Sequence, residues 1–191
     1  MVRQVSAAAA AEASELGPQD TANLAWALAR LPVRAAPSVQ AVLTRQARKN
    51  LAQFSPPGLA NFAWACATLQ DLGDAPLHEE ASQRSAQLIR TSPRACGLQM
   101  LSNTAWSFAV LGVASRDAPL CTAISASLTC HLHAMACSGA PPPADLAGWV
   151  SEVTAVVWAL HFASALPTPL TAAARSAVRR VGRSLDAAGS A

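Results

Sequence analysis

The sequence predicts an all-α protein, a right-handed α-solenoid of about four helical hairpins, on the basis of three observations. Hydrophobic residues form 52% of the chain and charged residues 13%, and the abundant alanine and leucine favour helix. Thirteen prolines and nine glycines punctuate the chain, so the helices should be short. A tryptophan-bearing segment also recurs along the chain, which is typical of a repeat architecture.

The recurring segment has the core Asn-x-Ala-Trp, which ends at Trp26, Trp64 and Trp106. A fourth, degraded copy ends at Trp158 and lacks the asparagine. The tryptophans of successive repeat segments are 38, 42 and 52 residues apart, and the longest step holds an insertion around residues 139–143. Three copies of an identical core indicate a true internal repeat.

Each unit is predicted to form two helices. Pro18 and Pro56 stand where proline suits the start of a tryptophan helix, and Leu-Pro or Leu-Gly pairs at 31–32, 72–73 and 111–112 end these helices. Second helices are expected over residues 38–54, 76–89, 119–135 and 169–185. The expected division is a partial preceding repeat or leader over 1–17, repeats over 18–55, 56–97 and 98–141, and a degenerate repeat over 142–187, all in one continuous domain.

The tryptophan helices are apolar over well over half of their circumference. Leucine or alanine recurs five, four and one residues before the tryptophan and two, three and five residues after it. Such a helix must be packed between neighbours, as in a stack of repeats. We therefore expect each repeat tryptophan to lie in this core and to bury roughly 150–250 Å².

A narrow sector lies outside the apolar arc, at six and three residues before the tryptophan and one and four residues after it. Small residues stand in its middle, asparagine recurs beside them, and the ends differ between units. A constant scaffold with variable ends predicts a modular reading surface. Its members are Asp20, Asn23, Ala27 and Arg30; Gly58, Asn61, Ala65 and Thr68; Met100, Asn103, Ser107 and Val110; Glu152, Ala155, Ala159 and Phe162.

These segments resemble the octotricopeptide repeat family of organellar proteins, whose pattern is Pro-x-x-Leu-Ala-Asn-x-x-Trp-Ala-Leu-Ala. Residues 56–67 are similar, with Cys66 at the second leucine of the pattern. The first copy has Thr21 in place of the first leucine, and the third has Ser102 and Ser107 in place of alanines. The likeness spans about residues 5–187 and extends to the leucine-rich region of FAST kinase-like proteins, which act on mitochondrial RNA. No segment resembles the C-terminal RAP domain of some relatives, so the nuclease-like chemistry suspected of that domain is not implied.

The resemblance implies an α-solenoid that binds single-stranded RNA in the chloroplast stroma or mitochondrial matrix. It would act in RNA processing, including rRNA processing, in mRNA stability or in translation, with other organellar RNA-processing proteins as further partners. The alternative is a protein-interaction scaffold, because stacked helix pairs also form grooves for peptides. A net charge of +3 does not decide between the two.

The candidate RNA-binding residues come from the sector and from arginines of the second helices. The recurring asparagines can contact RNA, or they can bond a backbone group of the next repeat and fix the stacking. The arginines can follow a phosphate backbone or form a solvated outer face. The candidates are Asp20, Asn23, Arg30, Asn61, Thr68, Asn103, Ser107, Glu152, Arg175, Arg179, Arg180 and Arg183.

We expect no enzyme, no cofactor and no metal. The chain contains no Gly-rich phosphate loop, no His-Glu-x-x-His and no Gly-x-Ser-x-Gly. Cys130, His133 and Cys137 share a helical face, but a structural zinc site needs four ligands from two segments.

Five irregularly spaced cysteines favour a reducing compartment. The longest apolar stretch, residues 153–166, is shorter than the ~20 residues of a membrane span. The Ala/Ser-rich first dozen residues resemble a transit peptide only faintly.

Overall fold

A computed structural model describes residues 16–32, 35–70, 72–93, 96–114, 118–137 and 145–189 of the chain. These residues form eight α-helices, one short 3-10 helix and no strand, so the all-helical prediction is confirmed. The elements are α2 (Pro18–Arg30), α3 (Pro37–Asn50), η2 (Leu51–Gln53), α4 (Pro56–Leu69), α5 (Ala75–Thr91), α6 (Leu98–Val110), α7 (Ala118–Cys137), α8 (Leu146–Phe162) and α9 (Thr168–Gly189). The partial repeat or leader expected over residues 1–17, apart from Leu16 and Gly17, and the insertion at 139–143 lie outside the described residues.

Proline and side-chain caps start the helices. Proline occupies the first turn of α2, α3, α4 and α5, where a missing N–H removes no helical hydrogen bond. The Ser55 hydroxyl accepts a hydrogen bond from the Gly58 N–H at the start of α4. At the start of α8, the Asp145 carboxylate accepts one from the Gly148 N–H at 2.8 Å. These caps satisfy N–H groups that the helix itself leaves unpaired.

The helix ends differ from the expected ones in α4. This helix stops at Leu69, before the Leu-Gly pair, because Gln70 adopts the left-handed conformation with φ of 57°. Its N–H then bonds the Cys66 carbonyl oxygen at 2.8 Å. Gly112, which follows the C-cap residue Leu111 of α6, has φ of 70°, as expected of a glycine that ends a helix.

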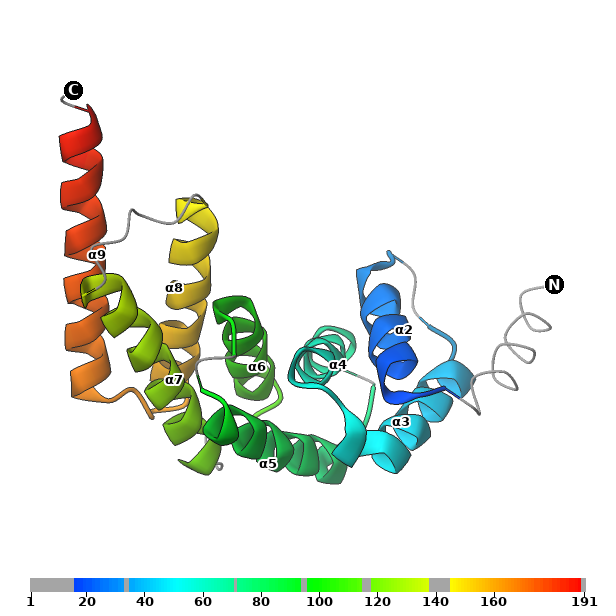
Figure 1. Ribbon diagram of the computed structural model, residues 1–191. Helices are drawn as coiled ribbons and strands as arrows, with labels where there is room; N and C mark the ends of the chain where they lie inside the picture. Colours follow the sequence, from blue (N-terminus) through cyan, green and yellow to red (C-terminus); the bar gives the residue numbers. More distant parts are fainter. Residues whose placement is uncertain are drawn as a thin grey trace.

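The helices form two layers that bend into an arch (Figure 1). The inner layer consists of α2, α4, α6 and α8, each packed against the next. In the outer layer α5 packs against α7 and α7 against α9, and each of α3, α5 and α7 also packs on the inner helix that precedes it in the chain. The inner helices line the concave side in Figure 1. Successive packing of this kind agrees with a helical repeat.

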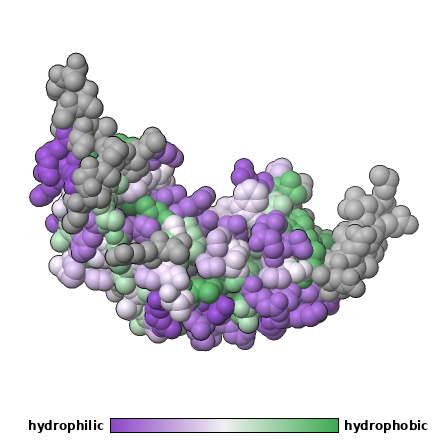
Figure 2. Space-filling view, viewed as in Figure 1, coloured by the Kyte–Doolittle hydropathy of each residue, from purple (hydrophilic) through white to green (hydrophobic). Residues whose placement is uncertain are grey.

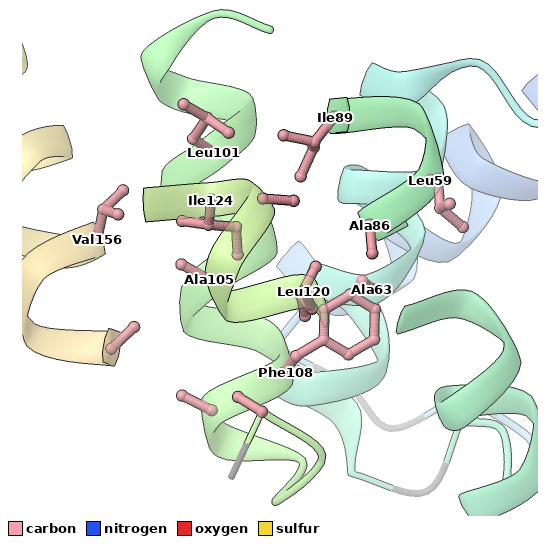
Figure 3. Packing of buried hydrophobic residues seen from close by; sticks show 14 of the residues in the cluster. Leu59, Ala63, Ala86, Ile89, Leu101, Ala105, Phe108, Leu120, Ile124 and Val156 are labelled. Atoms are coloured by element: carbon pink, nitrogen blue, oxygen red, sulfur yellow. The ribbon is translucent and has the colours of Figure 1, made fainter. Parts of the chain in front are cut away.

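One hydrophobic core runs through the layers. Phe62 of α4, two residues before Trp64, and Phe108 of α6, two residues after Trp106, are almost completely buried. In Figure 3 the Phe108 ring lies near Leu120 of α7, and alanines such as Ala105 stand along the contacts. Alanine lets neighbouring helices approach closely, so a core that is poor in aromatic residues can still pack densely.

Four cysteines form no disulfide within the described residues. Cys66, Cys96 and Cys121 are buried, and Cys130 is half-buried. Burial raises the pKa of the Cys66 thiol well above its ordinary value, so this thiol stays protonated. Within the described residues no group of three or more His, Cys, Asp or Glu could hold a metal ion. Among the described helices, none combines the length and apolar character that crossing a bilayer requires.

Candidate nucleic-acid interface on the inner helices

The repeat tryptophans lie at the surface of the inner layer. Trp26 is 38% exposed, Trp158 is 48% exposed, and Trp64 and Trp106 are half-buried. The expectation that they fill the core was therefore wrong. Trp149, which is not a repeat tryptophan, is buried instead.

Small residues take the buried place that was predicted for the tryptophans. Ala65, Ser107 and Ala159, each one residue after a tryptophan, are buried, although we expected this position to be open. Ala27, at the same position of the first unit, is exposed as expected. Gly58, six residues before Trp64, is also buried, and a Cβ added there would lie 3.9 Å from the Ala22 Cβ of α2. These small side chains mark the contact with the preceding inner helix. A tryptophan is too large for that contact and lies beside it.

The open sector is rotated toward the tryptophan by roughly 50° from the predicted one. It holds the positions seven and three residues before the tryptophan, the tryptophan itself, and the position four after it. Every one of these residues is exposed or half-buried. We call them the inner ridge: Gln19, Asn23, Trp26 and Arg30; Pro57, Asn61, Trp64 and Thr68; Gln99, Asn103, Trp106 and Val110; Ser151, Ala155, Trp158 and Phe162.

The inner ridge faces the hollow of the arch. Helices α4 and α6 each have an inner helix on both flanks and an outer helix behind, so their remaining side is the concave one. Spacings of four, three and four residues keep the ridge in one line along each helix. Figure 2 shows apolar patches interrupting the hydrophilic surface on this side.

The two ends of the ridge carry paired π groups at the same register. On α2 the Arg30 guanidinium carbon lies 4.8 Å from the centre of the Trp26 ring. On α8 the rings of Trp158 and Phe162 are stacked, with centroids 5.4 Å apart. A cation over an exposed indole contributes about 0.5–1 kcal/mol. Both pairs therefore hold a flat, accessible surface in a defined orientation.

A pocket of about 220 Å³ lies in the middle of the ridge. Asn61 and Asn103 both line it. Within the described part of the chain, no hydrogen bond engages either of these side-chain amides. The bond to a neighbouring repeat that was the alternative role for these asparagines is thus not found here. Asn23 differs, because its Oδ1 accepts a hydrogen bond from Gln19 Nε2 of the same helix at 3.0 Å.

Three other predicted residues lie off the ridge. Ser107 is fully buried, and its hydroxyl donates to the Asn103 carbonyl oxygen, so direct contact with a ligand was a wrong expectation. Asp20 is exposed in the first turn of α2, on the flank where no described helix precedes it. Glu152 is half-buried, and burial followed by the charge of Asp145 raises the pKa of its carboxyl group.

The predicted arginines other than Arg30 belong to the outer layer. Arg175, Arg179 and Arg183 are exposed and follow one another at four-residue intervals along α9. Arg180 is half-buried and has an interaction partner. A second basic group, Arg45, Arg48 and Lys49 on α3, lines a surface depression of about 620 Å³, with Arg48 in an ion pair with Asp74 at 2.7 Å. These basic groups therefore lie on outer helices, whereas the inner ridge lies on inner helices.

Comparison with known proteins finds a similarity to a plant protein. The chain is 30% identical, over 125 residues, to a rice (Oryza sativa subsp. japonica) protein described as a RAP domain-containing protein, chloroplastic. The alignment covers 51% of this chain and 19% of the rice protein, so the chain spans about a fifth of that relative's length. No protein-family profile matches the chain, and no solved structure matches it.

Proposed function

We propose that this chain binds single-stranded RNA along the inner ridge and serves organellar RNA processing, mRNA stability or translation without catalysing a reaction. The observation that carries the proposal is the row of accessible tryptophans, one per unit, on the concave side of the arch. Unstacked RNA bases stack on aromatic side chains and on arginine, each such contact contributing about 1–3 kcal/mol. Four platforms in register provide a multivalent surface for one strand.

The varied neighbours of the tryptophans supply selectivity in this proposal. Four residues after the tryptophan stand Arg30, Thr68, Val110 and Phe162 in successive units. A guanidinium, a hydroxyl and two apolar groups favour different base edges or faces. The tryptophan is then the common platform and its neighbour distinguishes one base from another.

The organellar setting rests on two likenesses. The repeat segments resemble octotricopeptide repeats, and the rice relative is described as chloroplastic, which favours the chloroplast stroma over the mitochondrial matrix. We also propose that the solenoid is right-handed and that further RNA-processing proteins act with it.

The proposal is tested by titrating the purified chain with fluorescently labelled oligonucleotides. Single-stranded RNA should bind, and a duplex of the same sequence should bind much more weakly, because its bases are stacked inside the helix. The Trp64→Ala and Trp106→Ala variants should each lose about tenfold in affinity while keeping their helical circular dichroism. Equal binding of duplex and single strand, or no binding at all, would contradict the proposal.

An apolar group on α8 favours a protein-interaction scaffold as the second candidate. Val150, Trp158 and Phe162 are 43%, 48% and 63% exposed, and exposed apolar groups of this size mark interaction sites. The same titration separates the candidates. The chain would be a scaffold if it is folded, binds no RNA, and loses binding to an organellar partner protein on Trp158→Ala.

A further inference from the structure

We propose that the pocket at the middle of the inner ridge holds one unstacked adenine, an inference that rests on the proposed RNA-binding function. Three inner helices build this pocket, which we call the inter-repeat pocket. Its lining comes from α2, α4 and α6: Trp26; Pro57, Ala60 and Asn61; Gln99, Met100 and Asn103. The pocket therefore exists only where successive units are stacked.

The size of the pocket fits a single heterocycle. Its volume of about 220 Å³ is several times that of one water molecule, ~30 Å³. It is smaller than the ~300–1,000 Å³ of sites for drug-sized ligands. Trp26, Pro57 and Met100 offer it the flat and polarisable surfaces on which an aromatic ring packs.

The charge of the lining excludes an anion as the main ligand. None of the seven lining residues is ionisable, and the polar side chains among them are the amides of Asn61, Gln99 and Asn103. A phosphate or carboxylate would need a cation or several backbone N–H donors. A neutral heterocycle with both donors and acceptors needs what an amide supplies.

The amides favour adenine, because both free edges of this base, N6 with N7 and N6 with N1, present a donor next to an acceptor. An asparagine or glutamine amide pairs with adenine through two parallel hydrogen bonds, accepting from N6 and donating to N7. The Asn61 and Asn103 amides are available for this, since no hydrogen bond within the described residues engages them. Guanine instead prefers an arginine, and the Arg30 guanidinium lies over the Trp26 ring rather than in the lining.

Arg30 contributes by positioning. Its guanidinium holds the Trp26 indole from one side at 4.8 Å, and Trp26 in turn forms a wall of the pocket. The same cation is exposed beside the pocket, where the phosphate linked to a bound base would pass. The base thus enters between the indole of one unit and the amides of the next two.

The test compares binding of labelled oligo(A), oligo(C) and oligo(U) RNA of equal length to the full chain. The wild-type chain should bind oligo(A) most tightly. Asn61→Ala and Asn103→Ala should each weaken oligo(A) binding about tenfold and leave oligo(C) binding within about twofold. The matched control is Gln53→Ala, which removes an exposed amide outside the ridge and should change no affinity.

The outcomes separate this inference from the proposed function. If oligo(A) and oligo(C) bind equally well, or if Asn61→Ala weakens both to the same extent, the adenine pocket is refuted while RNA binding stands. If no oligonucleotide binds, both proposals fail. Asn61→Leu, which keeps a similar volume without an amide, guards against a variant that merely distorts α4, and its thermal unfolding should match that of the wild type.

Discussion

Phe162 stacks on Trp158 at a ring-centroid distance of 5.4 Å with only 14° between the ring planes, and both rings remain largely exposed. An aromatic pair at the surface of the last inner helix contributes little to the core. Stacking partly covers one face of each ring and holds the two rings nearly parallel, so that their outer faces can stack on a further ring. The degenerate fourth unit has no asparagine at its ridge, yet it has this platform.

We predict that Phe162→Ala weakens binding of single-stranded RNA without unfolding the chain. Loss of one stacking surface should lower RNA affinity by about tenfold, because a base–aromatic stack contributes about 1–3 kcal/mol. The free energy of unfolding should change by less than about 1 kcal/mol, since the ring is 63% exposed. Anisotropy titration and urea denaturation measure the two effects. A large loss of stability with unchanged RNA affinity would mean that the pair is structural.

The core phenylalanine gives the opposite prediction. Phe108→Ala should lower the free energy of unfolding by about 3–5 kcal/mol, because the ring is fully buried and its removal leaves a cavity. Trp106→Ala, two residues earlier on the same helix, should cost less, since that side chain is only half-buried. Chemical denaturation of the two variants shows which of them loses more free energy of unfolding. If Trp106→Ala proves the more destabilising, the inner ridge is assigned to the wrong face.

This contrast shows where sequence reasoning succeeds and where it stops. Proline, glycine and the spacing of leucine and alanine predicted helices within a few residues of α2, α4 and α6. The helical wheel could not decide which edge of a wide apolar arc points to a neighbour. An alanine suits both an open surface and a close helix contact, so Ala65 and Ser107 were misplaced. A tryptophan next to small residues was the available signal, because a large ring cannot enter such a contact.

The inter-repeat pocket could not be predicted from the sequence. Asn61 and Asn103 were recognised as a recurring pair, but Trp26 and Pro57 join them only through the packing of α2 against α4 and of α4 against α6. A wheel describes one helix at a time. The distances between units are set by the small residues at the helix contacts. The hydrophobic periodicity of a single helix does not reveal these distances.

The arginine stripe of α9 gives a third prediction. Replacing both Arg179 and Arg183 with glutamate should weaken RNA binding several-fold and reduce its dependence on salt, because each lost phosphate contact lowers the salt slope by about one. The control is the double replacement of Arg45 and Lys49 with glutamate on α3, which changes the net charge equally. Equal losses in both variants would point to net charge alone, and unchanged affinity would remove α9 from the interface.

The fourth prediction concerns pH and the joint between the first two units. The Asp74 carboxylate caps α5 by accepting from the Leu77 N–H at 3.0 Å and binds Arg48 of α3 at 2.7 Å. The Leu77 N–H first, and then Arg48, hold the pKa of Asp74 below its ordinary value of 3.8. Asp74→Ala should therefore lower the free energy of unfolding at neutral pH by about 0.5–2 kcal/mol, as expected for a lost helix cap.

The pH dependence of this difference has a defined sign. A carboxyl group whose pKa is lowered by folding stabilises the folded state above its unfolded pKa, and it loses this contribution as pH falls through the folded value. The gap in unfolding free energy between the wild type and Asp74→Ala should thus be constant from neutral pH down to about pH 4. Below that pH it should narrow as the wild-type carboxyl group takes up its proton. Urea denaturation at a series of pH values measures the gap. A gap that widens on acidification would mean that the protonated side chain, and not the carboxylate, holds α3 and α5 together.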